Sequence, residues 1–405
     1  MPADNQMFKG VRVIELAQYV FVPAAGAILA DLGAEVIKIE TVEGDPYRSM
    51  SIGDGREKQA VNISMEQNSR GKKSIGLDLK TAEGRELLLK LVEGADILLT
   101  SLRPQALERL RLGVDDLRAR NPKLIYAHGN GLGFKGEEAS RAGYDASAFW
   151  SRGGFGHVLA RPGEPPVAPR PAFGDHTGAM SIAFGMAAAL FNRERSGEAA
   201  IVEISLLGTG MWVLSSDMTM AARAADLPPA PPPVIRQNPL RGTYETSDGR
   251  FMQFVLLQPD KYWQSMCQRL SRMDLFENPD YASDALRIAN GDMLIPELRA
   301  TFKARPLAYW RAALKGWDAP FEVIQTIQEV VDDPQAVAND YLFTVRAADG
   351  SDVRLVAGPV AFNGSAVPPN PRRAPDFGQD SEALLGALNL SAAEISDLRA
   401  RRIIA

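Results

Sequence analysis

Cysteine is nearly absent from this chain of 405 residues, which contains only Cys267. One cysteine cannot form a disulfide within the chain, and it excludes the multi-cysteine zinc sites. Histidine is also scarce, because His128, His157 and His176 are the three in the sequence and they lack metal-ligand spacing. A zinc site or a Ser-His-Asp triad therefore has little support, and we expect no bound metal.

Long apolar runs are missing as well. Asp175, Glu203 and Asp217 interrupt the most apolar region, so no run reaches the ~18 residues of a membrane span. Residues 1–7 contain no basic region followed by an apolar run, and we expect no signal peptide. The net charge of -5 does not favour binding to nucleic acid or to anionic membranes. We therefore expect a cytoplasmic protein without nucleic-acid or membrane partners.

Two common phosphate and nucleophile motifs, G-x-x-x-x-G-K-[ST] and G-x-S-x-G, do not occur. Residues Gly131–Gly136 match G-x-G-x-x-G, but they follow several predicted strands and no helix opens on them. Since a dinucleotide site needs a helix N-terminus at that position, we interpret the segment as a loop that lets backbone approach a ligand.

Strand and helix patterns alternate along the first half of the chain, which predicts an α/β fold with a Rossmann-like open sheet and helices on both faces. The predicted strands are 11–15, 35–40, 73–78, 95–100, 124–128 and 200–205, and the predicted helices are 24–32, 81–93, 104–110, 179–195 and 208–225. The polar, Gly-rich residues 42–67 are predicted to be loop.

The proline run Pro228–Pro233 predicts a stiff connector and the clearest domain boundary. We divide the chain into a large N-terminal part (1–225), a linker (226–239), a small α+β domain (240–330) and a C-terminal return to the large domain (331–405). The small domain has a predicted hairpin at 243–257 and helices at 262–269, 286–302 and 306–315. A second hairpin is predicted at 341–356 and a helical tail at 381–401, with a capping box from Ser391 to Glu394.

Asp175 lies where an irregular segment gives way to the apolar helix that ends at Gly197, and the preceding Gly174 frees the backbone for a sharp turn. The helix dipole and free backbone N–H groups favour an ionised carboxylate there. An ionised carboxylate held against a substrate can act as a nucleophile. Aspartate is also a preferred N-cap, so the residues alone leave capping and catalysis open.

Cations flank two strands of the predicted sheet. Lys72 and Lys73 precede one strand, and Arg103 and Arg109 follow another. They could converge on a rim that holds phosphates, because Arg and Lys both suit phosphate groups. The alternative is an ordinary solvated charged rim.

Taken together, these segments resemble the class III CoA-transferases, the family that includes formyl-CoA transferase, carnitine CoA-transferase and α-methylacyl-CoA racemase. The resemblance runs from about Gly10 to Arg402, and each motif is weak by itself, but their common order is specific. The matching segments are 10–15 (GVRVIE), 29–40 (LADLGAEVIKIE), 72–80 (KKSIGLDLK), 174–175 (GD), Gly197, 202–203 (VE), 332–335 (DDPQ) and 374–378 (APDFG).

The resemblance implies that Asp175 is the nucleophile, that a CoA ester is the substrate and that no cofactor is permanently bound. It also implies an interlocked dimer of ring-shaped chains, with 228–233 and 330–340 as the two linkers, and small carboxylic acids as co-substrates. The family's CoA contacts fall on Val20, Phe21, Leu77, Asp78, Leu79, Lys80, Ser101, Leu102, Arg103, Arg109, Ala142, Gly143, Tyr144 and Asp145.

Departures from the family pattern bear on the substrate. Formyl-CoA transferase has glutamine where this chain has Val20, and a glycine run where this chain has only Gly242, which argues against a formyl and oxalyl pair. The racemases have histidine where this chain has Tyr144. We therefore predict an acyl-CoA:carboxylate CoA-transferase, in which 131–136 and 238–243 are candidate lids or oxyanion donors. A 2-methylacyl-CoA racemase or epimerase, and a CoA-ester binding protein without turnover, are the alternatives.

Overall fold

The computed structural model describes residues 6–50, 61–161, 163–223 and 238–405, which form two compact units. The first unit is Met1–Ala222 with Pro334–Ala405, and the second is Arg223–Asp333. The proline connector predicted at 228–233, and the linker residues up to 237, lie outside the described residues. No helix in the described ranges is both long enough and apolar enough to span a membrane.

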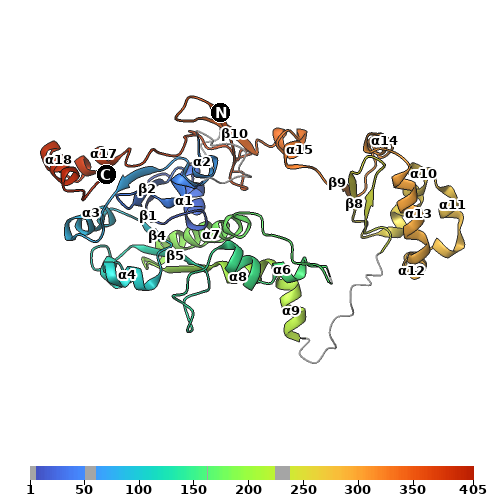
Figure 1. Cartoon of the computed structure of the whole chain (residues 1–405), viewed down its shortest axis with the longest axis horizontal. Helices are drawn as coiled ribbons and strands as arrows, with labels where there is room; N and C mark the ends of the chain where they lie inside the picture. The colour runs from blue at the N-terminus through green and yellow to red at the C-terminus, as the bar shows by residue number, and fades with distance from the viewer. Residues whose placement is uncertain (1–5, 51–60, 162, 224–237) are drawn as a thin grey trace. The chain divides into compact units, whose positions relative to one another are not determined.

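A six-stranded parallel sheet organises the first unit (Figure 1). The strand order is β3-β2-β1-β4-β5-β6, and Val13 of β1 pairs with Val36 of β2 on one side and Ile97 of β4 on the other. The strand order therefore reverses between β1 and β4, because β2 and β3 are added on one side of β1 and β4 to β6 on the other. Open α/β sheets bind ligands at such a reversal, beyond the carboxyl ends of the strands. The strands are β1 (Arg12–Leu16), β2 (Glu35–Glu40), β3 (Lys73–Gly76), β4 (Ile97–Thr100), β5 (Ile125–Asn130) and β6 (Ile201–Ser205).

Successive strand residues enter different cores, because side chains alternate between the two faces of a sheet. Val13 packs with α1 (Phe21–Asp31) and α7 (Phe173–Ser196), whereas Ile14 packs with α3 (Ala82–Glu93), α4 (Pro104–Leu110) and α5 (Val114–Arg118). Both faces of the sheet are thus covered by helices, as the α/β pattern predicts. The remaining helical segments before residue 224 are η1 (Pro46–Ser49), α2 (Ile63–Ser69), the π-helical η2 (Asp145–Arg152), α6 (Phe155–Val158), α8 (Leu206–Val213) and α9 (Ser215–Arg223).

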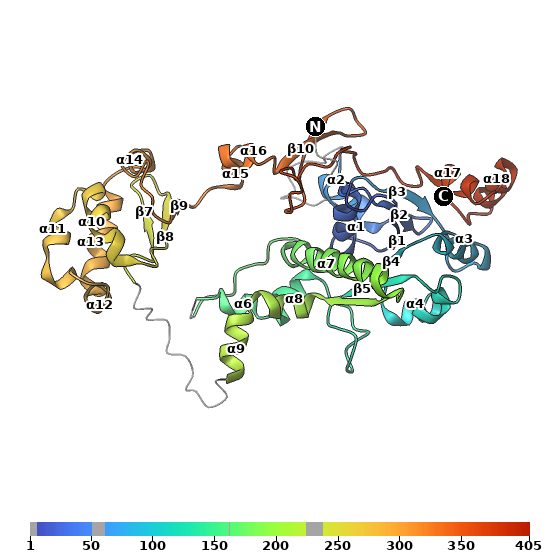
Figure 2. The same cartoon turned by 180° about the vertical axis from the view of Figure 1, so that it is seen from behind.

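The C-terminal segment closes the β3 edge of the sheet. The Ala405 amide donates to the Gly76 carbonyl over 3.2 Å, and the Asp78 amide donates to the Ile403 carbonyl over 2.9 Å. Both views show α17 (Ser381–Ala387) and α18 (Ala392–Ala400) at this end of the sheet, near α3 (Figures 1 and 2). Before them, the hairpin of β10 (Leu342–Arg346) and β11 (Asp352–Val356) docks on α2 through two hydrogen bonds between Gln67 and Val356. Two short helices, α15 (Ile327–Val331) and α16 (Pro334–Ala338), precede the hairpin.

The second unit is a small α+β unit with its own aromatic core, which includes Tyr244, Phe254, Trp263 and Phe302. Its antiparallel sheet has a third strand that the hairpin pattern did not predict. The helix predicted at 286–302 is two helices, because the chain is interrupted at Asn290. The elements are β7 (Thr243–Glu245), β8 (Phe251–Phe254), β9 (Phe321–Val323), α10 (Pro259–Leu270), α11 (Met273–Glu277), η3 (Pro279–Tyr281), α12 (Asp284–Ala289), α13 (Gly291–Lys303) and α14 (Leu307–Ala313).

Two other predictions in the first unit are wrong. The segment expected to be loop at 42–67 contains η1 and α2, whose N-termini are capped by the side chains of Asp45 and Asn62. Polar residues mark these caps, and a composition argument mistakes them for loop. The helix expected at 208–225 begins earlier and breaks at Leu214, so that α8 and α9 are separate helices.

Candidate active site

Asp175 lies in the first turn of α7, which starts at the carboxyl edge of the sheet. The last turn of α7 reaches the opposite edge, where Arg193 pairs with Asp96 just before β4 over 2.6 Å. Ala172, not Gly174, carries the left-handed backbone at the helix start, with a φ of 62°. Gly174 is needed for close packing instead, because a Cβ there would lie 2.2 Å from Cγ of Phe149.

The N-terminus of α7 is capped by Asp145 rather than by Asp175. The Gly174 amide donates to Oδ1 of Asp145 over 3.0 Å, and the Phe173 amide also donates to this carboxylate. Asp175 is the third residue of the helix, and no side chain from the N-cap position caps it. The interpretation of Asp175 as the N-cap is therefore wrong, and its carboxylate is available for another role.

Burial and the nearby Asp145 charge raise the pKa of Asp175 to about 7. Burial also raises the pKa of Asp145, even though its bonds to the Gly174 and Phe173 amides act in the opposite direction. The helix end alone favours an ionised Asp175, but burial and a like charge outweigh it in this environment. Burial raises the free energy of the ionised carboxylate. Acylation to a neutral anhydride removes this penalty, which favours nucleophilic attack by Asp175.

Two polar residues, one near Asp175 and one bonded to the next residue His176, have no signal in the sequence motifs. Burial raises the pKa of Tyr47 against the opposing hydrogen bond to Ser64, and the charges of Asp175 and Asp45 raise it further, which keeps this phenol neutral next to the carboxylate. Nε2 of His176 donates to Oδ1 of Asn68 on α2 over 2.9 Å, while the Asn68 amide nitrogen donates to the Ser64 carbonyl. Tyr47 comes from the segment expected to be loop, and Asn68 directly follows that segment, which explains why sequence analysis missed them.

The expected CoA contacts at 20–21 and 101–103 follow β1 and β4, the two strands at which the sheet order reverses. The Gln18 amide donates to Oγ of Ser101 over 3.3 Å and ties the two loops together. The Val20 and Phe21 side chains are buried, and Phe21 contacts α7 so closely that a Cβ on Gly178 would lie 2.3 Å from its ring. The side chains of these two residues therefore belong to the core and are not available to a ligand.

A groove of about 710 Å³ opens beyond β3 and α4 and carries four cations. It brings together three of the expected CoA contacts, namely Leu79, Lys80 and Arg109. Arg85 and Arg111 also line it, and both were missed because neither belongs to a family motif. The groove can hold a polyanion such as a chain of phosphates. Among its other lining residues are Thr81, Ala82, Ala106 and Leu110.

The other expected contacts lie near the groove or near Asp175. Leu77 is buried and bridges to Ile404, while Asp78 accepts from the Lys80 amide at the turn into α3. Residues 142–145 form the loop that enters η2 and supplies the Asp145 cap. Gly143 packs on Gly131 so tightly that a Cβ on Gly131 would lie 2.6 Å from its Cα.

Lys72 and Lys73 do not contribute to a phosphate-binding rim. They are at the amino end of β3, the edge opposite Arg103 and Arg109. Nζ of Lys72 is fully buried and lies 2.7 Å from Oε2 of Glu15, and Lys73 pairs with Glu35 over 2.5 Å. The hypothesis of convergence fails because the two pairs of cations mark opposite ends of parallel strands.

The glycines at 131–136 form a turn rather than a dinucleotide site. The side chain of Asn130 bonds both the amide and the carbonyl of Gly133 over 2.7 Å. The next helical element in the described chain, η2, begins only at Asp145, so no helix N-terminus faces these glycines. No cluster of potential metal ligands occurs among the described residues either.

Comparisons with known proteins agree over almost the whole chain. The chain is 31% identical to the (R)-2-hydroxy-4-methylpentanoate CoA-transferase of Clostridioides difficile, covering 98% of this chain and 99% of that protein. It is 32% identical to the cinnamoyl-CoA:phenyllactate CoA-transferase of Clostridium sporogenes, covering 98% of this chain and 97% of that one. The crystal structure of Rv3272 from Mycobacterium tuberculosis superimposes with a TM-score of 0.79 at 29% identity, covering 93% and 98% of the two chains. The model of CoA-transferase family III matches residues 8–381, and this chain belongs to that family.

Proposed function

We propose that this family III enzyme moves CoA from an acyl-CoA donor to a carboxylic acid, with Asp175 as the nucleophile. The observation that carries the mechanism is a buried carboxylate, relieved of capping by Asp145, at the edge of the sheet where ligands bind. The backbone of the loops after β1 and β4, and the cationic groove beyond β3, supply neighbouring surfaces for the CoA ester.

The reaction then proceeds through two covalent states. An oxygen of Asp175 attacks the thioester carbonyl, the C–S bond breaks, and a mixed anhydride and CoA thiolate form. The thiolate attacks the aspartyl carbonyl, which breaks the anhydride, releases the donor acid and leaves a thioester between CoA and Asp175. The acceptor carboxylate repeats these steps in reverse. Water must be excluded, because it hydrolyses the anhydride.

The acyl group that we propose is that of a 2-hydroxy acid or its dehydrated, unsaturated counterpart. This assignment draws on the two relatives above, whose names specify (R)-2-hydroxy-4-methylpentanoate, and cinnamoyl-CoA with phenyllactate. A matrix of acyl-CoA donors against carboxylic acids, with the mass of the CoA products as the readout, tests it. Cinnamoyl-CoA with phenyllactate is expected to react faster than acetyl-CoA with oxalate. The reverse order would contradict the substrate class while leaving CoA transfer intact.

The pH dependence of kcat/KM follows from the raised pKa of Asp175. Only the ionised carboxylate attacks, so kcat/KM should rise with pH through a midpoint of about 7. An ordinary exposed aspartate, with its reference value near 3.9, would give a flat profile between pH 5 and 8. Initial rates at low donor concentration across this range distinguish the two. A flat profile would show that Asp175 is ionised throughout or is not the attacking group.

Arg109→Ala should weaken donor binding much more than it slows the chemical steps. Its guanidinium lines the cationic groove, away from the reacting carbonyl, and uniform binding affects KM rather than kcat. We expect KM for the acyl-CoA to rise about tenfold or more, with kcat within about twofold, since a charge-assisted bond contributes about 1.5–3 kcal/mol. Arg120→Ala, which removes an exposed cation paired with Glu86 and Glu93, is the matched control. Equal KM values in the two variants would remove Arg109 from the binding site.

We also propose that two chains interlock as ring-shaped protomers, with 226–239 and the segment after 330 as linkers between a large domain and a small domain. Support comes from large apolar side chains exposed on the first unit. Phe184 and Phe191 on α7 are 75% and 65% exposed, and Trp212 on α8 is 77% exposed. An interlocked dimer cannot separate without unfolding, so light scattering at nanomolar concentration should still give the dimer mass. An active monomer at that concentration would contradict interlocking.

A further inference from the structure

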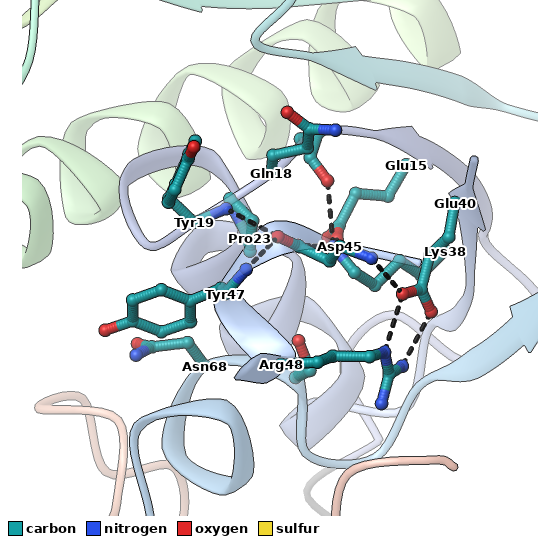
Figure 3. Close-up of polar contacts among 12 residues, drawn as sticks. Glu15, Gln18, Tyr19, Pro23, Lys38, Glu40, Asp45, Tyr47, Arg48 and Asn68 are labelled. Carbon is teal, nitrogen blue, oxygen red and sulfur yellow. Dashed lines mark hydrogen bonds and ion pairs between the residues drawn. The ribbon is translucent and has the colours of Figure 1, made fainter. Parts of the chain in front are cut away.

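Four charged side chains with almost no solvent exposure form a compact network, namely Glu15 on β1, Lys38 on β2, Asp45 before η1 and Lys72 before β3. Figure 3 labels the first three of them. Lys38 lies between Glu15 and Asp45, with Nζ 3.4 Å from Oε1 of Glu15 and 2.8 Å from Oδ2 of Asp45. Nζ of Lys72 lies 2.7 Å from Oε2 of Glu15 and donates to Oε1 of the same carboxylate over 2.9 Å, and it also donates to the Pro23 and Asn68 carbonyls. The two negative and two positive charges of these side chains cancel, and the reaction proposed above uses none of the four.

Asp45 is the member of this network that reaches the active site. Its Oδ1 accepts the Tyr47 amide over 2.9 Å and the Tyr19 amide over 3.4 Å, and Figure 3 shows both bonds converging on one carboxylate. Tyr19 belongs to the loop after β1, and Tyr47 belongs to η1 after β2. One buried oxygen thus joins the segments that follow the neighbouring strands β1 and β2, next to the point where the sheet order reverses.

Tyr19 has a backbone conformation that needs such support. Its φ is +66°, in the left-handed region that residues with a Cβ rarely adopt. Strain of this kind persists only where the surroundings enforce it. The Asp45 bond to the Tyr19 amide, and the Lys38 bond to the Ala17 carbonyl over 2.8 Å, hold the loop at the strained residue and two residues before it.

The conformation places three aromatic rings together. The ring of Tyr19 meets that of Tyr47 edge-on at 6.1 Å and that of Tyr144 edge-on at 5.6 Å between centroids. Tyr144 immediately precedes Asp145, the cap of α7, and Tyr47 is close enough to Asp175 for that charge to affect its phenol. The three rings therefore link the strained loop to both carboxylates of the site.

We propose that Asp45 is a positioning residue for the attack by Asp175, acting through the backbone of Tyr19 and Tyr47 to place their rings beside the nucleophile. The proposal rests on the function proposed above. A purely structural role explains the observations less well, because buried ion pairs are often replaced by apolar residues without loss of stability. What an apolar residue cannot supply is an acceptor for both tyrosine amides.

The test compares two double variants with the same net charge. Asp45→Asn with Lys38→Met keeps an acceptor oxygen for the two amides, and Asp45→Leu with Lys38→Met removes it. With cinnamoyl-CoA and phenyllactate, or the fastest pair of the substrate matrix, we expect the Asn variant to retain kcat within about fivefold. We expect the Leu variant to lose a further hundredfold or so in kcat, with KM for the donor within about threefold, because positioning affects the chemical step.

Folding is checked by thermal unfolding, and a third variant keeps the proposal testable if the Leu variant does not fold. Tyr19→Gly removes the ring and relieves the strained φ, so it should fold and lose at least tenfold in kcat. Equal kcat in the two folded double variants, or full kcat in folded Tyr19→Gly, would overturn the proposal. Failure of the function itself is distinguishable, because wild-type protein would then form no covalent CoA adduct on Asp175.

Discussion

Replacing Asp175 by asparagine is expected to abolish turnover while the protein remains folded. An amide is not a nucleophile that can form the anhydride, so kcat should fall by about 10⁴-fold or more, the scale seen when a covalent nucleophile is removed. The fold should survive because Asp145, not Asp175, bonds the Gly174 amide at the start of α7. Steady-state rates, together with thermal unfolding of both proteins, measure the two effects. Asp217→Asn, an exposed acid in the first turn of α9, is the matched control.

The same substitution should stabilise the protein at neutral and higher pH. The folded pKa of about 7 lies above the usual aspartate value of 3.8, so the folded state holds the proton more tightly. The cost of ionising Asp175 is therefore absent below about pH 4, grows from there to about pH 7, and is complete above it. Because the side chain is partly solvated, we expect Asp175→Asn to raise the free energy of unfolding by about 2 kcal/mol at pH 8. The difference should vanish near pH 4, and a variant less stable at pH 8 would indicate a structural role for the carboxylate.

Lys72→Met is expected to have the largest effect on stability. Nζ of Lys72 is fully buried, and it pairs with Glu15 and donates to the Pro23 and Asn68 carbonyls. Its loss leaves Glu15 with only the longer contact to Lys38, and breaking a buried pair by removing one partner costs about 3–5 kcal/mol. Denaturant unfolding measures the change, and Lys72→Met with Glu15→Gln should recover much of the loss.

Lys73 provides a control for this prediction from the adjacent position. It pairs with Glu35, but 37% of its side chain is exposed. A pair of that kind contributes about 1 kcal/mol or less, so Lys73→Met should unfold almost like the wild type. Similar losses for both lysines would contradict the account of the buried network.

The parallel sheet was predictable because its strands are short apolar runs separated by helices, and the structure confirms a mixed α/β fold with six parallel strands. The edge at which each residue lies was harder to predict. Lys72 and Arg109 both flank strands, but only a residue after a strand reaches the carboxyl edge. The direction of the chain distinguishes them, and charge pattern alone does not.

The environment of Asp175 could not be read from local sequence. Asp145, which caps α7, lies thirty positions before Asp175 in the sequence. Which of the two acids bonds the free amides at the start of α7 therefore depends on how η2 packs against α7. Similarly, Tyr47 lies in the polar segment 42–67, whose composition resembles a loop, and Asn68 directly follows that segment. The family motifs identify a candidate nucleophile, but the groups that set its pKa and orientation belong to segments without motifs.

The most direct measurement of the central claim follows the oxygens of Asp175. The wild-type enzyme is incubated with an acyl-CoA donor and an acceptor acid labelled with oxygen-18, digested, and analysed by mass spectrometry. If Asp175 forms the anhydride with the acceptor, each turnover leaves one acceptor oxygen on its carboxylate, and the label accumulates in the peptide that contains it. Label in that peptide, absent from Asp175→Asn, is the predicted result. Transfer of CoA without label on Asp175 would contradict the mechanism.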